Sequence, residues 1–227
     1  MTLYHYPPQT ALKRVIPKTR IYDGAGASTA LRERFTREVE QILWAHKLAP
    51  ETLNLPATKA VPEIQVIHLT PKGDSIHDDI LRAIDRAIPF PLIFEIHHGA
   101  QVEPAAAYKR PSEAEAGKWV IHDPLRAPRT TTRAPLPVAV NMRALYDGML
   151  APFIPATAQA GEDVETRLAR AAAIRAKEKE INALQTKMQR ERQFNIKLTL
   201  HGQLAKAQAE VELVKNGGAG CPARVTN

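Results

Sequence analysis

The hydrophobic positions of this 227-residue chain recur with a helical period in three separate segments. In residues 29–47, 76–88 and 142–153, apolar side chains return every three or four positions, the spacing that places them on one face of a helix. Each segment follows a residue that commonly caps a helix N-terminus: Ser28, Ser75 and Asn141. The pattern therefore predicts three amphipathic helices.

Shorter apolar runs of strand length lie between the predicted helices. Residues 63–69 alternate after Pro62, residues 92–96 and 102–108 flank a turn at Gly99, and residues 118–122 form a further run. Because consecutive runs are joined by links of hairpin length, we expect a small, mainly antiparallel or mixed sheet packed by helices, which is an α+β domain.

The last third of the chain has the composition of a long helix. Between Glu162 and Lys215, Ala, Lys, Glu, Arg, Gln and Leu dominate, and Gly202 is the one glycine or proline. We favour a continuous helix because no turn residue precedes Phe194, and a helical hairpin is the alternative. The expected organisation is an N-terminal arm (1–20), the α+β domain (21–154), a linker (155–161), the helical segment (162–215) and a disordered tail (216–227).

The apolar residues of the helical segment form a seam that is too narrow to stabilise a lone helix in water. The candidates for this coiled-coil-like seam are Ile174, Ile181, Leu184, Met188, Phe194, Leu198, Leu204 and Val211. We therefore expect the segment to bind a partner, which is another part of itself, a second copy or a different protein.

The charge and the cysteine content narrow the function classes only slightly. A net charge of +7, spread along the chain, permits contact with nucleic acid without requiring it. The single cysteine, Cys221, excludes an intramolecular disulfide and a cysteine-based zinc site. The N-terminus lacks the layout of a signal peptide, and no apolar run reaches membrane-spanning length, so a cytoplasmic location is expected.

The best polar cluster in the sequence consists of His97, His98, His122 and Asp123. If the strands that carry His97 and His122 pair, a metal site with imidazole and carboxylate ligands is conceivable. However, the spacing matches no zinc motif, and successive strand residues face opposite ways, so His97 and His98 do not easily bind one ion. Histidines at strand ends near the surface are the simpler interpretation, and we predict no metal and no cofactor.

A metal-dependent nuclease of the restriction type is a weaker alternative. Such a site needs an acidic residue before one strand and a Glu-x-Lys on the next, so that two carboxylates hold Mg²⁺. Glu63 and Glu95 are the candidate carboxylates, with His97 where the lysine is expected. The sequence contains no phosphate-binding loop, nucleophile elbow or His-Glu-x-x-His motif.

Aromatic and basic residues stand together near the predicted strand ends, a combination that can stack bases and neutralise phosphates. The candidates for such a nucleic-acid contact are Tyr108, Lys109, Arg110, Lys118, Arg126, Arg129 and Arg133. An ordinary amphipathic rim explains the same residues more simply.

The layout as a whole resembles a bacterial family catalogued as a domain of unknown function. The matching pieces, from about residue 14 to 214, are Ile16-Pro17-Lys18, Leu43-Trp44, Lys47-Leu48, Glu63-Ile64-Gln65-Val66, Ile84-Asp85, Pro89, Pro91-Leu92-Ile93-Phe94, Ala107-Tyr108-Lys109-Arg110, Leu145-Tyr146, Phe194-Asn195 and Lys197-Leu198. The resemblance implies genes beside SNF2- or DEAD-type helicases and DNA methyltransferases, which are the surroundings of restriction and phage-defence systems. It supplies no catalytic residue.

The hypothesis from the sequence is therefore an accessory, non-catalytic subunit of a DNA-processing restriction or anti-phage defence complex. It would bind a helicase or a DNA methyltransferase, or a second copy of itself, through the C-terminal helical segment, and DNA is a further possible partner. The alternatives are a divergent metal-dependent nuclease and a stand-alone nucleic-acid-binding module.

Overall fold

The fold is that of a computed structural model, which describes residues 2–216. The chain divides into two compact units, and the boundary falls between Phe153 and Ile154. The predicted disordered tail lies outside the described residues, apart from Asn216 at its start.

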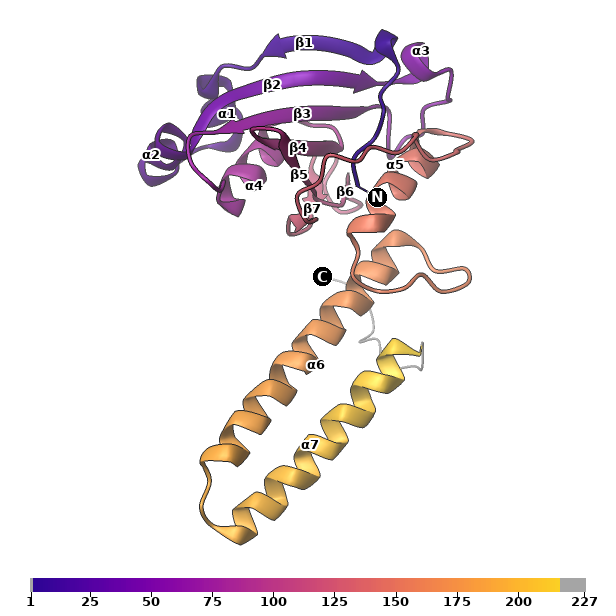
Figure 1. The fold of residues 1–227 in the computed structure, drawn as a ribbon. Coiled ribbons are helices and arrows are strands. Elements are labelled where there is room, and N and C mark those ends of the chain that lie inside the picture. The colour runs from indigo at the N-terminus through magenta and orange to yellow at the C-terminus, as the bar shows by residue number, and fades with distance from the viewer. Residues whose placement is uncertain (1, 217–227) are drawn as a thin grey trace. The chain divides into compact units, whose positions relative to one another are not determined.

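A six-stranded mixed sheet forms the centre of the first unit (Figure 1), in the spatial order β1-β2-β3-β4-β5-β8. Its strands are β1 (Ala11–Val15), β2 (Val39–Leu48), β3 (Ile64–Pro71), β4 (Leu92–His98), β5 (Gln101–Ala106) and β8 (Leu125–Arg126). Strands β3 and β4 are parallel, and the other neighbours are antiparallel. A separate two-stranded sheet contains β6 (Lys109–Pro111) and β7 (Trp119–Ile121). The predicted α+β class is confirmed.

The main core lies between the sheet and the helix α4 (Asp78–Ala87), which links the parallel strands β3 and β4. Ile80, Leu81 and Ile84 are fully buried, as are Ile67 of β3 and Phe94 of β4, all in one apolar cluster. The remaining helices of the unit are α1 (Lys18–Ala25), α2 (Thr29–Glu38), α3 (Pro50–Leu53) and α5 (Met142–Leu150), with 3₁₀ turns η1 (Pro8–Thr10) and η2 (Ala151–Phe153). A strand–helix–strand crossover of this kind is what makes two neighbouring strands parallel.

The predicted N-terminal cap is correct for one helix and wrong for another. Asn141 caps α5 as predicted, and its side-chain oxygen accepts a hydrogen bond from the backbone N–H of Ala144 at 2.9 Å. Ser75 does not cap α4. His77 holds that position, and its Nδ1 accepts a hydrogen bond from the N–H of Asp79 at 3.2 Å.

The prediction of one helix over residues 29–47 is wrong. Helix α2 ends at Glu38, and the next ten residues form β2. Two irregularities in the pairing of β2 with β3 shift the register, and the buried residues of β2 therefore recur every third position, at Val39, Ile42, Ala45 and Leu48. That spacing imitates a helical face, although a regular strand would bury every second residue.

The expected irregular N-terminal arm is also wrong in part. Residues 11–15 form the edge strand β1, paired with β2, and α1 begins at Lys18. The first residues are held as well, because Tyr4 forms a bridge with Ala134 and its ring is buried.

A close approach between α1 and α4 makes Gly24 sensitive to substitution. A Cβ atom at this position would lie 2.9 Å from Ala87 Cβ and 3.0 Å from Ala87 Cα. We expect Gly24→Ala to lower the free energy of unfolding by about 1–2 kcal/mol, because the overlap outweighs the helical preference of alanine. Urea unfolding would measure this loss, with Gly73→Ala as the control, since a Cβ at Gly73 meets nothing within 4 Å. Equal stability of the two variants would contradict the prediction.

The second unit is a helical hairpin of α6 (Val164–Arg190) and α7 (Phe194–Lys215), which run side by side in Figure 1. The continuous helix that we favoured is therefore wrong, and the hairpin alternative is correct. The turn needs neither glycine nor proline. Glu191 leaves the helix with extended backbone angles, and its Oε1 accepts hydrogen bonds from the N–H groups of Arg192 and Gln193, both at 2.8 Å.

The hairpin is closed by an apolar seam and by ion pairs between its helices. Leu204, Ala207 and Val211 of α7 are buried. Lys177 of α6 pairs with Glu210 of α7 at 2.6 Å. Two residues of the predicted linker are held by hydrogen bonds, because Arg167 and Arg170 donate to the backbone carbonyls of residues 156 and 157.

Candidate functional site

The parallel strands β3 and β4 bring polar side chains together on the sheet face opposite α4. Ile67 and Phe94 point into the core with α4, so their neighbours His68 and Glu95 point the other way, as does His97 two positions further along β4. The register pairs His68 with Glu95 directly. We call His68, Glu95 and His97 the histidine–glutamate cluster.

The three side chains of this cluster converge on one carboxylate oxygen. Nε2 of His68 lies 3.3 Å from Oε2 of Glu95, and Nε2 of His97 lies 3.9 Å from the same oxygen. One nitrogen from each histidine and one oxygen of Glu95 all lie within 4.8 Å of one another. Glu95 is fully buried, whereas the side chains of His68 and His97 are 22% and 31% exposed. Solvent therefore reaches part of each histidine ring, whereas both Nε2 atoms are buried.

Arg133 fixes the charge state of Glu95. Its guanidinium donates two hydrogen bonds to the carboxylate, at 2.9 Å and 2.6 Å, and a third to the backbone oxygen of Tyr4 at 2.7 Å. Burial alone would raise the pKa of Glu95, but the contacts with His68 and Arg133 outweigh it and hold that pKa at about 2. The carboxylate is therefore negatively charged at neutral pH.

Three polar atoms around Glu95 are buried: Nε2 of His68, Nε2 of His97 and the hydroxyl oxygen of Tyr6. His68 and Tyr6 have the Glu95 carboxylate as their neighbour, whereas Nε2 of His97, 3.9 Å from it, has no hydrogen-bond partner. Burial, and then the nearby charge of Glu95, raises the pKa of Tyr6 well above its usual value. Burial, and then the proximity of His68, lowers the pKa of His97, which leaves a neutral imidazole with a lone pair.

A third histidine, His46, extends the cluster on β2. The His46 ring lies 6.1 Å from that of His68 and 4.5 Å from that of Tyr6, measured between centroids. Its Nδ1 is hydrogen-bonded to the hydroxyl of Thr10 at 2.9 Å, and burial together with His68 lowers its pKa to about 4.

The structure separates most of the residues that the sequence grouped together. Strand β4 pairs with β3 and β5, not with β7, so His97 and His122 do not share a sheet. His98 faces away from His97 and contacts Glu103 at 3.2 Å. The metal grouping of His97, His98, His122 and Asp123 that was conceivable from the sequence is therefore not formed, and Asp123 pairs with Arg82 instead.

Glu63 does not join Glu95 and His97. It precedes β3 by one residue and lies five positions before His68, a distance of about 16 Å along an extended strand. Its carboxylate contacts Lys47 at 3.2 Å and Gln65 at 2.7 Å. The three residues of the nuclease alternative thus do not form one site.

The candidates for nucleic-acid contact are mostly engaged within the protein. Tyr108 and Lys109 are buried, and Lys109 donates to the carbonyl oxygens of Asp85 and Ile88. Each of the other candidate residues contacts an acidic side chain or a carbonyl oxygen: Arg110 with Glu113, Lys118 with Glu115, Arg126 with Asp78 and Glu103, Arg129 with Asp74, and Arg133 with Glu95. Nucleic-acid contact through these residues stays a prediction.

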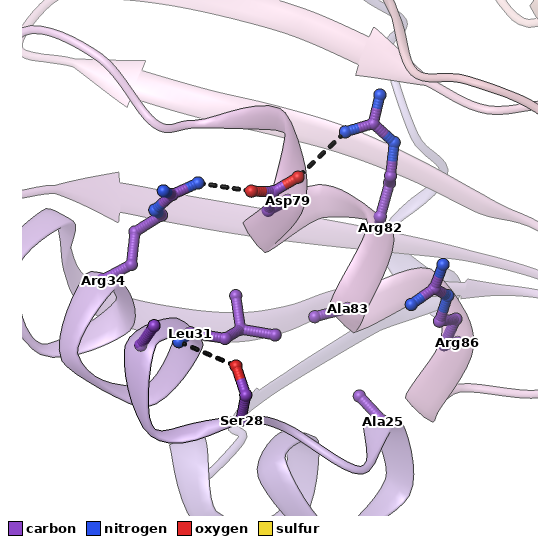
Figure 2. Close-up of a pocket in the computed structure, with 9 residues that line it drawn as sticks. Ala25, Ser28, Leu31, Arg34, Asp79, Arg82, Ala83 and Arg86 are labelled. Atoms are coloured by element: carbon purple, nitrogen blue, oxygen red, sulfur yellow. Dashed lines mark hydrogen bonds and ion pairs between the residues drawn. The ribbon is translucent and has the colours of Figure 1, made fainter.

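A second candidate is a pocket of about 240 Å³ beside α2 and α4, drawn in Figure 2. Arg34, Arg82 and Arg86 line it together with Asp79. Asp79 forms ion pairs with both Arg34 and Arg82, and Arg82 also pairs with Asp123. Because two of the three arginines are already neutralised in this way, the pocket is a weaker site than the histidine–glutamate cluster.

The predicted partner-binding residues of the helical segment divide into three groups. Leu204 and Val211 are buried within the hairpin. Ile174, Ile181, Leu184 and Met188 of α6 are half-buried. Phe194 and Leu198, together with Ile196, remain exposed at 76%, 63% and 42% just after the hairpin turn. We call Phe194, Ile196 and Leu198 the hairpin-tip surface.

Within residues 2–216, none of the helices combines the length and the apolar character that a bilayer crossing demands. No curated protein and no solved structure matches the chain significantly. A family model described as Domain of unknown function (DUF4391) matches residues 5–211, which include both the histidine–glutamate cluster and the hairpin-tip surface. This chain therefore belongs to the DUF4391 family.

Proposed function

We propose that this chain is an accessory, non-catalytic subunit that binds a larger protein through its C-terminal helical hairpin. The observation that carries the proposal is the exposed hairpin-tip surface, three large apolar side chains just after the hairpin turn, whereas the other residues of the predicted seam are buried or half-buried. Phe194 and Leu198 are four residues apart, so they lie on one face of α7 and together can fill an apolar groove.

The energetics favour a protein partner for this surface. Burying a Phe or Leu side chain is worth about 1.5–3 kcal/mol. Aromatic residues are enriched among the few side chains that carry most of the binding energy at protein interfaces. Exposed Phe194 is thus suited to anchor a contact, with Leu198 beside it.

The proposed partner is a DNA-processing enzyme, a SNF2- or DEAD-type helicase or a DNA methyltransferase. The resemblance described above supports this class, and the proposed setting is a restriction or anti-phage defence complex. The net charge of +7 is compatible with DNA held nearby by the partner. A nuclease is not proposed, because Glu63 lies apart from Glu95 and His97.

Co-purification of the full chain with the helicase or methyltransferase encoded beside it tests the proposal. We expect the double variant Phe194→Ser and Leu198→Ser to reduce the amount of co-purified partner at least about tenfold, since two apolar anchors are lost. Leu213→Ser is the matched control, because Leu213 is exposed on the same helix but lies far from the turn.

The control variant should retain the partner, and all variants should show the same helical circular dichroism. Full retention by the double variant would refute docking through the hairpin tip. Direct DNA binding by the isolated chain, weakening steeply with salt, would instead favour a nucleic-acid-binding module.

A further inference from the structure

We propose that His68, Glu95 and His97 bind one divalent transition-metal ion, with Zn²⁺ as the ion that fits best. The proposal is independent of the function suggested for the hairpin, because all three residues belong to the first unit. It rests on the geometry of the ligand atoms, on their chemistry and on the polar atom that the protein leaves unpaired.

The distances are close to those between the ligands of a tetrahedral metal. Bonds of about 2.0–2.1 Å to zinc place neighbouring ligand atoms roughly 3.3 Å apart. The two histidine nitrogens lie 3.3 Å and 3.9 Å from the same oxygen of Glu95. Small side-chain rotations at the partly exposed histidines would bring all three atoms to bonding distance of one ion.

The ligand atoms also match zinc in their chemistry. Two imidazole nitrogens and one carboxylate oxygen are ligands that zinc and its first-row neighbours accept, whereas Ca²⁺ and Mg²⁺ prefer oxygen alone. The Nε2 atoms of both histidines are buried, and that of His97 lacks a hydrogen-bond partner, which costs free energy unless something binds it. One metal ion would satisfy both nitrogens at once and leave a fourth position for water.

Arg133 would not bind the metal itself, but it is hydrogen-bonded to the carboxylate that would. Each oxygen of Glu95 accepts one hydrogen bond from the guanidinium, and each has a second lone pair. Arg133 therefore fixes the orientation of Glu95 and leaves Oε2 able to bind an ion, as groups behind metal ligands commonly do. Its positive charge opposes cation binding whereas the orientation that it gives Glu95 favours it, so Arg133→Gln should still bind the metal.

The test uses the full chain with Cys221→Ser in every sample, so that the thiol cannot supply a ligand. After metal removal with a chelator, Zn²⁺ is titrated by calorimetry, and Co²⁺ is added separately to follow its visible absorption. We expect one ion per chain, and a dissociation constant at least about tenfold higher in His68→Ala and in His97→Ala. The control His201→Ala changes an exposed histidine of α7 and should bind as the parent does.

Stability provides a second measurement. Zn²⁺ should raise the melting temperature of the parent and of Arg133→Gln, but not that of His97→Ala, because a ligand stabilises only the fold that binds it. If His68→Ala does not fold, the more exposed His97 still decides the result through His97→Ala. No binding by the parent, or equal binding by His97→Ala, would overturn the proposal and leave the cluster as a buried polar network that binds only water.

Discussion

Replacing Lys109 with methionine is expected to lower the free energy of unfolding of the first unit by about 3–5 kcal/mol at pH 8. The Lys109 ammonium and the Asp85 carboxylate are both buried, with Nζ 3.9 Å from Oδ1. Both oxygens of Asp85 lack a hydrogen-bond partner, so Lys109 is the charge that compensates this carboxylate. Its removal leaves Asp85 buried beside no cation, which is one of the most costly changes a core can undergo.

The loss should depend on pH in a defined direction. Burial raises the pKa of Asp85 from 3.8 to about 7, and the attraction of Lys109 opposes that rise. In Lys109→Met the pKa is therefore raised at least as far, and the folded state binds the proton more tightly than the unfolded state. The contribution of protonated Asp85 to the stability of the folded state is therefore largest below pH 4, and it is lost as the pH rises toward 7.

A double variant isolates this contribution. Asp85→Leu combined with Lys109→Met removes both charges, and its stability should return to within about 2 kcal/mol of the parent. The difference in the free energy of unfolding between Lys109→Met and the double variant should decrease by about 2–3 kcal/mol from pH 8 to pH 5. Urea unfolding followed by tryptophan fluorescence measures it, since both tryptophans, Trp44 and Trp119, lie in the first unit. A difference that is independent of pH would contradict the buried-carboxylate explanation.

Val211→Asp should unfold the helical hairpin without unfolding the sheet. Val211 is 3% exposed in the seam of α7, and an unpaired carboxylate there costs several kcal/mol. Two helices with a narrow apolar seam do not have that much stability to lose. Most of the helical signal from the 27 residues of α6 and the 22 of α7 should disappear from the circular dichroism spectrum.

Leu213→Asp is the matched control for this change, because Leu213 lies two positions further along the same helix and is 55% exposed. It should keep the hairpin folded. The tryptophan fluorescence of the first unit should be the same in both variants and in the parent. Retained helicity in Val211→Asp would show that the seam contributes less than the ion pairs between the helices.

Sequence patterns predict the elements whose signals are local. Helix α4 has a strong apolar stripe and acidic residues in its first turn, and the turn at Gly99 joins two apolar runs as β4 and β5. Gly99 has a φ of 62°, a conformation that glycine adopts without strain. These features arise within about ten residues, so they can be read without knowledge of the rest of the fold.

The sequence does not predict β2, because its irregular pairing with β3 is a property of two strands together. The third-position burial of Val39, Ile42 and Ala45 depends on where the register shifts, and nothing local marks those points. The hairpin turn at Glu191 is missed for another reason. A glutamate side chain replaces the glycine or proline that usually signals a turn.

Part of the histidine–glutamate cluster could be predicted from the sequence. A strand, a helix and a strand in succession indicate neighbouring parallel strands, which would have placed residues 64–69 beside 92–96. The register that pairs His68 with Glu95 is not encoded in that pattern. Tyr6 and Arg133 interact with the same carboxylate, although they lie far apart in the sequence. No local signal connects them.

The edge strand β1 protects the molecule from unwanted self-association. An open sheet edge offers unpaired backbone groups to any other extended chain, and natural proteins interrupt such edges. Here the pairing is irregular between Ala11 and Arg14, and Lys13 adopts a φ of 52°, which breaks the regular row of donors and acceptors. The strand at the other edge, β8, comprises two residues. Both edges of the sheet are therefore poor templates for strand addition by another copy of this chain.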